Sequence, residues 1–320
     1  GTLSVLHTMP KKKDPNRLDL ARWMVDEKNP LTARVTINRI WQRYFGFGLV
    51  ETENDFGTQG TRPSHPKLLD WLASEFMRQK WSMKAMHRLI VSSGTYQRSS
   101  HARSDLKLID PRNRLLSHQN RLRLDAELVR DNALSVSGLL TRKVGGPSVF
   151  PPQPKGVYAF TQVKKNWKAS VGEDRYRRGL YTHFWRSAPH PGLMAFDAPD
   201  SNTTCTRRSR SNTPIQALTL LNDEAYYECA RNLALRVMRE KESSRLDFLF
   251  RVCLAREPSA REKSRLQRYL ISQQSSFQQA PSEAKLVLGQ AAKKHPAHVQ
   301  AAWTMVARVV LNLDELITRE

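Results

Sequence analysis

A polar loop followed by a strongly periodic apolar segment, within residues 197–237, constrains the fold of this 320-residue chain more than any other feature. Thr213, Pro214 and Gln216 match a capping box, with a hydroxyl at the N-cap, proline at the first helical position and Gln at the third. The apolar residues that follow recur at the spacing of one helix face, at Leu218, Leu221, Ala225, Cys229, Leu233 and Val237. The sequence therefore predicts a loop held at the positive end of one long amphipathic helix.

The loop before this helix, residues 197–212, is the strongest candidate for a binding site. Arg207, Arg208 and Arg210 precede the helix N-terminus, where backbone N–H groups and the helix dipole favour an anion. Arginine adds planar donors that suit a carboxylate, sulfate or phosphate. The alternative is an internal network in which the arginines pair with nearby acids, namely Asp197, Asp200, Asp223 and Glu224.

The rest of the chain predicts a mainly α, multi-helix compact domain with a Pro/Gly-rich insertion and a few short strands. The insertion is clearest at residues 145–156, which hold four prolines and three glycines. Aromatic and β-branched residues indicate short strands at 157–162 and 179–185. Apolar periodicity and capping residues predict helices over 17–28, 31–45, from 65, from 82, 126–140, 213–237, 245–255, 260–274, 282–293 and 299–319. The expected organisation is a linker at 1–16, a helical part at 17–144, the irregular insertion at 145–196 and a helical part at 197–320, with 17–320 forming one structural unit.

The formal net charge of +22 raises the question of a polyanionic partner. Basic residues are spread along the chain, and the single short run is Lys11-Lys12-Lys13, so a basic solvated surface accounts for the charge better than nucleic-acid binding does. Acidic polysaccharide stays open as a partner. No apolar run approaches the length of a membrane span. The chain begins at Gly1 with no signal-like segment, which predicts either a removed leader or a fragment of a longer polypeptide.

The three cysteines and nine histidines give no clear metal or catalytic pattern. There is no C-x-x-C and no haem-attachment motif, so no cofactor is expected within the chain. Cys205 lies among basic residues, which favour a thiolate, but no histidine base can be assigned to it and an inert role is preferred. His295 and His298 are two ligands at most, too few to predict a metal site.

Seven blocks of sequence, in one order from Arg17 to the end of the chain, resemble a single family. They are NPLTARVTINRIWQRYFGFGLVETENDFG, HPKLLDWLASEF, GTYQRSS, RLRLDAELVRD, DRYRRGLYT, RRSRSNTPIQALTLLND and LNLDELITRE. The family is the planctomycete-type C-terminal domain of unknown function that follows a cytochrome-c-like module in large secreted bacterial proteins. The resemblance implies an extracellular or periplasmic location and a haem-carrying upstream module of the same polypeptide as partner.

The resemblance supplies no activity and no catalytic residues, but it does single out polar positions. Those in the matching blocks are Arg34, Asn38, Arg39, Asp55, Gly57, Asp125, Arg130, Asp131, Arg207, Arg208, Asn212, Thr213, Pro214, Gln216, Asn222 and Asp223. With Asp197 from the loop, the candidate ligand-binding set is Arg34, Asn38, Arg39, Asp55, Asp125, Asp197, Arg207, Arg208, Asn212, Thr213, Gln216 and Asp223.

The leading hypothesis is an exported accessory domain that binds an anionic or polyhydroxylated ligand, such as an acidic or sulfated glycan, through the 197–216 loop and the helix of Arg34 and Arg39. A second hypothesis is an enzyme, either a hydrolase or a haem-coupled redox enzyme, that uses Asp and Arg side chains of the same blocks. A third is a structural or interaction domain whose polar blocks form ion-pair networks. Nucleic-acid binding, which rests on charge alone, comes last.

Overall fold

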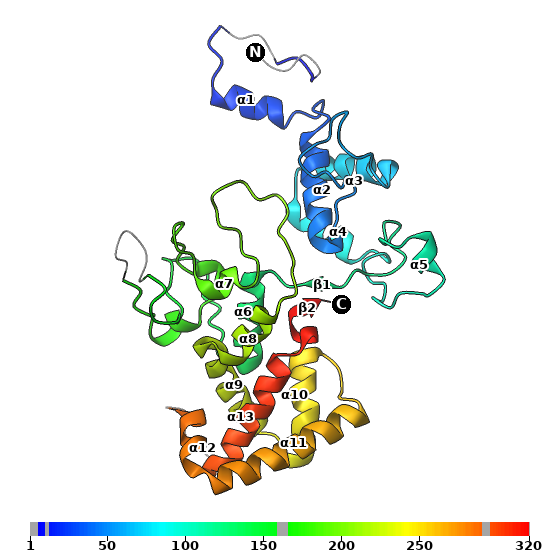
Figure 1. Cartoon of the computed structure of the whole chain (residues 1–320). Coiled ribbons are helices and arrows are strands. Elements are labelled where there is room, and N and C mark those ends of the chain that lie inside the picture. The colour runs from blue at the N-terminus through cyan, green and yellow to red at the C-terminus, as the bar shows by residue number, and fades with distance from the viewer. Residues whose placement is uncertain (1–5, 10–12, 159–165, 290–294, 320) are drawn as a thin grey trace. The chain divides into compact units, whose positions relative to one another are not determined.

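The computed structural model describes residues 6–9, 13–158, 166–289 and 295–319, and the chain is mainly α-helical, as predicted (Figure 1). Backbone contacts divide it into two compact units, the first running to Leu122 and the second from Arg123 to Arg319. The boundaries that the sequence suggests near residues 145 and 197 both fall within the second unit. The expectation of one structural unit over residues 17–320 stays a prediction.

The first unit contains five helices in the described chain: α1 (Arg17–Met24), α2 (Thr32–Phe45), α3 (Pro66–Arg78), α4 (Met83–Val91) and α5 (Leu106–Ile109). The predicted boundaries of α2 are nearly correct. Asn29 accepts hydrogen bonds from the backbone N–H groups of Leu31 and Thr32, and Gly46 ends the helix at a φ of 87°. That φ lies in the left-handed region, which glycine adopts without a steric penalty.

The core of the first unit forms where the apolar faces of α2, α3 and α4 meet. Ile37, Phe45, Leu69 and Met86 are at most 2% exposed, and Trp41 stacks on Phe45 with ring centroids 4.2 Å apart. The helical periodicity of the three segments accounts for this arrangement, because each places its apolar residues on one side. The core thereby holds the C-terminal end of α2 and the turn after it in place.

The division between the units falls within a short strand, β1 (Leu122–Arg123), which pairs with β2 (Thr318–Arg319); the first helix of the second unit is α6 (Ala126–Ser137). The strand predicted at residues 179–185 is wrong. That segment begins with a 3-10 helix, η2 (Gly179–Tyr181), and Thr182 makes only an isolated bridge to Val149. Of the strand predicted at 157–162, residues 159–162 lie outside the described chain, and residues 157 and 158 form no strand. A further 3-10 helix, η1 (Gly172–Tyr176), and the short helix α7 (Pro191–Met194) complete this region.

A buried arginine organises the irregular region in place of a sheet. The Arg177 side chain is 1% exposed, and its guanidinium donates to the carbonyl oxygens of Lys143, Gly145 and Pro147. The same group lies over the Tyr181 ring, 3.8 Å from its centroid. Five N–H donors on one planar group allow a single side chain to satisfy several carbonyl groups that no strand pairs.

The long helix predicted after Thr213 is divided into two by Asp223. The helices are α8 (Pro214–Asn222) and α9 (Glu224–Val237), and the Asp223 side chain accepts from the Ala225 N–H as the N-cap of α9. The capping-box prediction is only half right: Thr213 is the N-cap of α8 and Pro214 follows it, but the Thr213 side chain makes no capping hydrogen bond. Gln216 is instead turned inward and is 1% exposed.

Four helices complete the second unit, α10 (Arg245–Leu254), α11 (Ala260–Gln279), α12 (Pro281–Leu288) and α13 (Ala297–Leu311). α13 packs against both α9 and α11, and Val306 and Val310 are fully buried at this junction (Figure 1). The last helix was predicted to run to residue 319, but it stops at Leu311 and is followed by a 3-10 helix, η4 (Asp314–Ile317), and β2. Among the helices of the described chain, none is long and apolar enough to cross a membrane.

Candidate functional site

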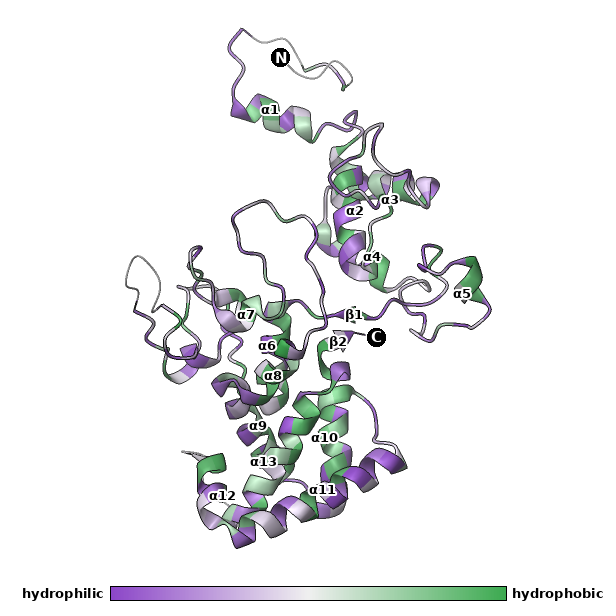
Figure 2. Ribbon diagram, in the orientation of Figure 1, coloured by the Kyte–Doolittle hydropathy of each residue, from purple (hydrophilic) through white to green (hydrophobic). Residues whose placement is uncertain are grey.

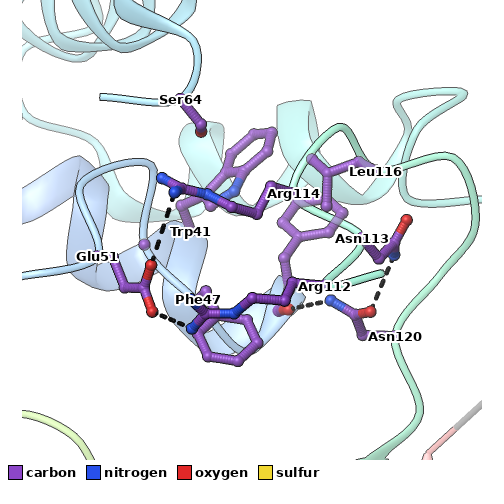
Figure 3. Close-up of a pocket in the computed structure, with 11 residues that line it drawn as sticks. Trp41, Phe47, Glu51, Ser64, Arg112, Asn113, Arg114, Leu116 and Asn120 are labelled. Carbon is purple, nitrogen blue, oxygen red and sulfur yellow. Dashed lines mark hydrogen bonds and ion pairs between the residues drawn. The ribbon is translucent and has the colours of Figure 1, made fainter. Parts of the chain in front are cut away.

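A pocket in the first unit, with a cavity volume of about 30 Å³, lies beside the end of α2 (Figure 3). Its floor is aromatic, because Trp41 and Phe45 reach it from the last turns of α2 and Phe47 from the turn that follows. Charged and amide side chains come from two loops that are distant in sequence. The full lining is Trp41, Phe45, Phe47, Gly48, Glu51, Ser64, Arg112, Asn113, Arg114, Leu116 and Asn120.

The turn that forms one wall of the pocket is fixed by Asn38. This side chain is fully buried, and its amide donates to the Val50 carbonyl oxygen over 2.9 Å and accepts from the Val50 N–H over 2.8 Å. Gly48 passes so close to the amide that a Cβ there would lie 2.5 Å from the Asn38 nitrogen. These contacts set the position of Glu51, one residue beyond Val50.

Two asparagines fix the other wall. Asn113 accepts from the Ser117 N–H and donates to Asn120, whose own amide donates to the Phe45 carbonyl oxygen over 2.7 Å. The loop that carries Arg112 and Arg114 is thereby tied to the end of α2 (Figure 3). Buried amides with this many partners are satisfied, and they act here as supports.

The charges in the pocket are two guanidinium groups against one carboxylate. Arg112 donates to the Glu51 carboxylate and lies over the Phe47 ring, 5.9 Å from its centroid. Arg114 approaches the same carboxylate only to 3.9 Å, beyond hydrogen-bonding distance, and its side chain is 42% exposed. The pocket therefore has one positive charge in excess, and the partly exposed Arg114 guanidinium has N–H donors that are not hydrogen-bonded to Glu51, a suitable arrangement for binding an anion.

The candidate residues of the first unit that were named from the sequence do not line this pocket. Arg34 pairs with Asp70 over 2.7 Å on the outer side of α2, and Arg39 is exposed. Asn38 does not line the pocket, but its hydrogen bonds to Val50 fix the turn that carries Glu51. Asp55 accepts from the Gly57 N–H over 2.8 Å within the loop after α2.

In the second unit, two of the three loop arginines lie against the N-terminus of α6. Arg208 donates both terminal nitrogens to Glu127, over 2.6 and 3.2 Å, and is 3.8 Å from Asp125. Arg210 is also 3.8 Å from Asp125. The structure brings together two of the candidates named from the sequence, Arg208 and Asp125. The internal partners suggested for the arginines were Asp197, Asp200, Asp223 and Glu224, whereas the main partner of Arg208 is Glu127, which lies 81 residues away along the chain.

Asp197 and Gln216 close the base of the loop. The Asp197 carboxylate accepts from both the N–H and the hydroxyl of Ser211, over 2.7 and 2.9 Å, and the Gln216 amide donates to the same hydroxyl over 3.1 Å. Asp223 is occupied as the N-cap of α9, and its pKa is raised by burial. These residues therefore hold the loop against α8.

The remaining loop candidates are exposed. Arg207, Asn212 and Cys205 all lie on the surface, and the Cys205 thiol contacts the Arg207 carbonyl oxygen at 3.4 Å. Arg207 is thus the arginine of this loop that is most accessible to a ligand. Thr213 is half-buried beside them, at the start of α8.

A second polar network lies between α6 and the segment 175–179. Asp131 accepts from the Arg178 guanidinium and from the Gly179 N–H, each over 2.6 Å. Arg175 pairs with Glu224 and Glu228 of α9. Arg123 lies before α6 but donates to Asp314.

Two buried basic groups adjoin this network. Arg130 is 8% exposed and donates to the Arg175 carbonyl oxygen, and burial lowers its pKa. Burial also lowers the pKa of His190 to about 4; its ring lies within hydrogen-bonding distance of the Pro152 carbonyl oxygen and accepts from the Gly192 N–H. Across the described ranges, no group of three or more His, Cys, Asp or Glu side chains is placed to hold a metal ion.

The candidate residues named from the sequence do not include the pocket residues Phe47, Glu51, Arg112 and Arg114. Glu51 and Arg112 are 61 residues apart, so no local motif connects them. The one local signal is the Arg-Asn-Arg triplet at 112–114, which places two arginines next to an asparagine typical of a tight turn.

Comparison with known proteins gives one match. A family model described as PSD1, a protein of unknown function (DUF1553), matches residues 16–270, which include the pocket and the arginine-rich loop. The comparison with curated proteins found no match, and neither did the comparison with solved structures.

Proposed function

The chain belongs to the PSD1 (DUF1553) family, and we propose that it is an exported accessory domain that binds an acidic glycan through the pocket of the first unit. The observation that carries the proposal is the arrangement of Arg114, whose partly exposed guanidinium is not hydrogen-bonded to Glu51, while that single carboxylate is engaged by Arg112. A sulfate or carboxylate group of a sugar can occupy this position and form charge-assisted hydrogen bonds.

The aromatic floor of the pocket favours a sugar over a small inorganic anion. Phe47, which is 43% exposed, provides apolar surface against which the C–H face of a sugar ring can pack, while the arginines bind its anionic substituent. Pockets that combine aromatic walls with a few polar groups are typical of small-ligand sites. The cavity, about 30 Å³, is the size of one or two water molecules, so the sugar would lie on the surface at the pocket and direct only its anionic substituent toward Arg114.

The arginine-rich loop of the second unit is retained as a second contact for the same polymer. Arg207 is its exposed cation, and Arg208 and Arg210 are held nearby by Asp125 and Glu127.

The binding proposal is tested by titrating the protein with a sulfated heparin-type oligosaccharide, its desulfated form and duplex DNA at several salt concentrations. Arg114→Gln is expected to weaken binding of the sulfated sugar by roughly 10–100-fold, the value of one to two charge-assisted hydrogen bonds. Arg207→Gln tests the loop in the same assay.

The matched control is Arg78→Gln, because Arg78 is an exposed, ion-paired arginine of the first unit that does not line the pocket. Equal losses in the Arg114 and Arg78 variants, or equal and steeply salt-dependent binding of sugar and DNA, would show that net charge alone is responsible.

The export of the domain and its association with a cytochrome-like module are supported by the resemblance of the seven sequence blocks described above. They are tested on the native polypeptide by cell fractionation with an antibody against this domain and by haem staining of the immunoreactive band. A band in the cytoplasmic fraction that does not stain for haem would contradict both parts of this proposal.

A further inference from the structure

The loop around α5 presents an unusual amount of apolar surface. Leu108 is 94% exposed, Ile109 72% and Leu115 63%. Figure 2 shows the short helix α5 in the hydrophobic colour range, although it projects from the unit. Single exposed leucines are ordinary on protein surfaces, but three such side chains within eight residues form a patch. We refer to Leu108, Ile109 and Leu115 as the loop tip.

Hydrogen bonds within the first unit fix the backbone that carries the loop tip. Both Asp110 carboxylate oxygens accept from backbone N–H groups, of Arg114 over 2.9 Å and of Leu115 over 2.7 Å. Arg98 donates to the Leu116 carbonyl oxygen over 2.6 Å, and Leu116 has a φ of 56°. The hydrogen bonds of Asp110 and the left-handed backbone of Leu116 fix the conformation of the loop. The apolar side chains of the loop tip cannot turn into the core unless these bonds break.

The surroundings of the loop tip are basic. Arg103 is 72% exposed, Arg112 61% and Arg114 42%. Of the two acids of the loop, Asp105 pairs with Arg103, and the Asp110 carboxylate accepts from backbone N–H groups. Over residues 98–121 the sequence holds six basic residues and two acids, namely Arg98, Arg103, Lys107, Arg112, Arg114 and Arg121 against Asp105 and Asp110.

We propose that the loop tip docks on an anionic lipid surface, with Leu108, Ile109 and Leu115 inserted among the acyl chains and the surrounding arginines at the level of the headgroup phosphates. An apolar projection ringed by cations is the pattern of a peripheral membrane contact, because the two forces act on the same side of the molecule. Charge complementarity favours an anionic lipid surface as the partner. An apolar groove of another protein would make no favourable electrostatic interaction with the surrounding arginines.

The membrane contact does not depend on the glycan site, although Arg112 and Arg114 are near both. The test is flotation of the full chain with vesicles of phosphatidylcholine alone or mixed with phosphatidylglycerol. We expect the protein to float with the mixed vesicles at low salt and to stay behind with phosphatidylcholine alone. The double variant Leu108→Ser with Ile109→Ser is expected to lower binding roughly tenfold or more.

The matched control is the double variant Val171→Ser with Leu286→Ser, which removes two apolar side chains of similar exposure, 80% and 77%, from the second unit. It should float like the wild-type chain. The proposal is overturned if the wild-type chain does not float with the anionic vesicles or if it binds both vesicle types equally. It is also overturned if the two double variants bind the anionic vesicles to the same extent. The Leu108 and Ile109 variant should still bind the sulfated oligosaccharide, so failure of the membrane proposal and failure of the glycan proposal are separate results.

Discussion

Replacement of Asn38 by alanine tests whether this buried residue, which lies in one of the seven matching sequence blocks, stabilises the turn after α2. The Asn38 side chain is fully buried, and it satisfies both the N–H and the carbonyl group of Val50, which is itself 2% exposed. Removing the amide leaves two buried backbone groups without a partner, and each costs about 1–3 kcal/mol. We expect Asn38→Ala to lower the local unfolding free energy by about 2–5 kcal/mol, with the lower value applying if water enters the space.

Hydrogen exchange followed by mass spectrometry measures this loss where it occurs. A loss of 2–5 kcal/mol corresponds to amide exchange that is faster by between about 30-fold and a few thousand-fold in peptides that cover α2 and the turn to Val50. Asn212→Ala is the matched control, because Asn212 is exposed, and it should change exchange very little. Unchanged protection in the Asn38 variant, or equal effects of both substitutions, would refute the assignment of Asn38 as a buried support.

Three further predictions concern the second unit. Burial lowers the pKa of His190 from 6.5 to about 4, so as the pH falls the unfolded chain takes up a proton on this residue before the folded chain does. We therefore expect the free energy of unfolding to be unaffected by His190 above pH 6.5 and to fall by about 3 kcal/mol between pH 6.5 and pH 4. Urea midpoints across this pH range should therefore depend less on pH in His190→Gln. Ser259→Ala removes one half of the capping box that Ser259 and Glu262 form at the start of α11, which should cost about 1 kcal/mol in urea unfolding, and no change would rule out the cap. Gly179→Ala places a Cβ 2.7 Å from the Glu127 carbonyl oxygen, so we expect a loss of roughly 1–3 kcal/mol in thermal unfolding, whereas unaltered stability would mean that the segment can move away from α6.

The helical framework was predictable because its signals are local. α2, α3 and α4 each carry an apolar stripe with a period near 3.6, and proline or a hydroxyl residue marks where α3 and α4 begin. The division at Asp223 was missed because the apolar period continues across it, so that periodicity alone does not separate two helices from one. The strand at 179–185 was wrong for a related reason: aromatic content indicates a pleated surface only where a partner strand exists.

The sites were less predictable than the fold because their contacts are distant in sequence. A network with nearby acids was one of two alternatives for the loop arginines; Arg208 lies 3.8 Å from Asp125, yet its closest carboxylate belongs to Glu127 on the helix that Asp125 precedes. Nearby acids in the sequence, Asp197 and Asp223, are occupied by backbone N–H groups instead. A single sequence carries no information about which arginine meets which carboxylate across such separations, and the pocket around Glu51 and Arg112 was missed for the same reason.

The buried Arg177 has a consequence for how this chain can change over evolution. A sheet restricts insertions, since a shift of one residue turns every side chain of a strand to the opposite face. Within the described chain, the segment around Arg177 makes only two isolated bridges, to Thr141 and to Val149, and the carbonyl groups of Lys143, Gly145 and Pro147 are bound by one guanidinium in place of a strand. Neighbouring loops can therefore gain or lose residues without disturbing these bonds, and the arginine itself is the position at which related chains should differ least.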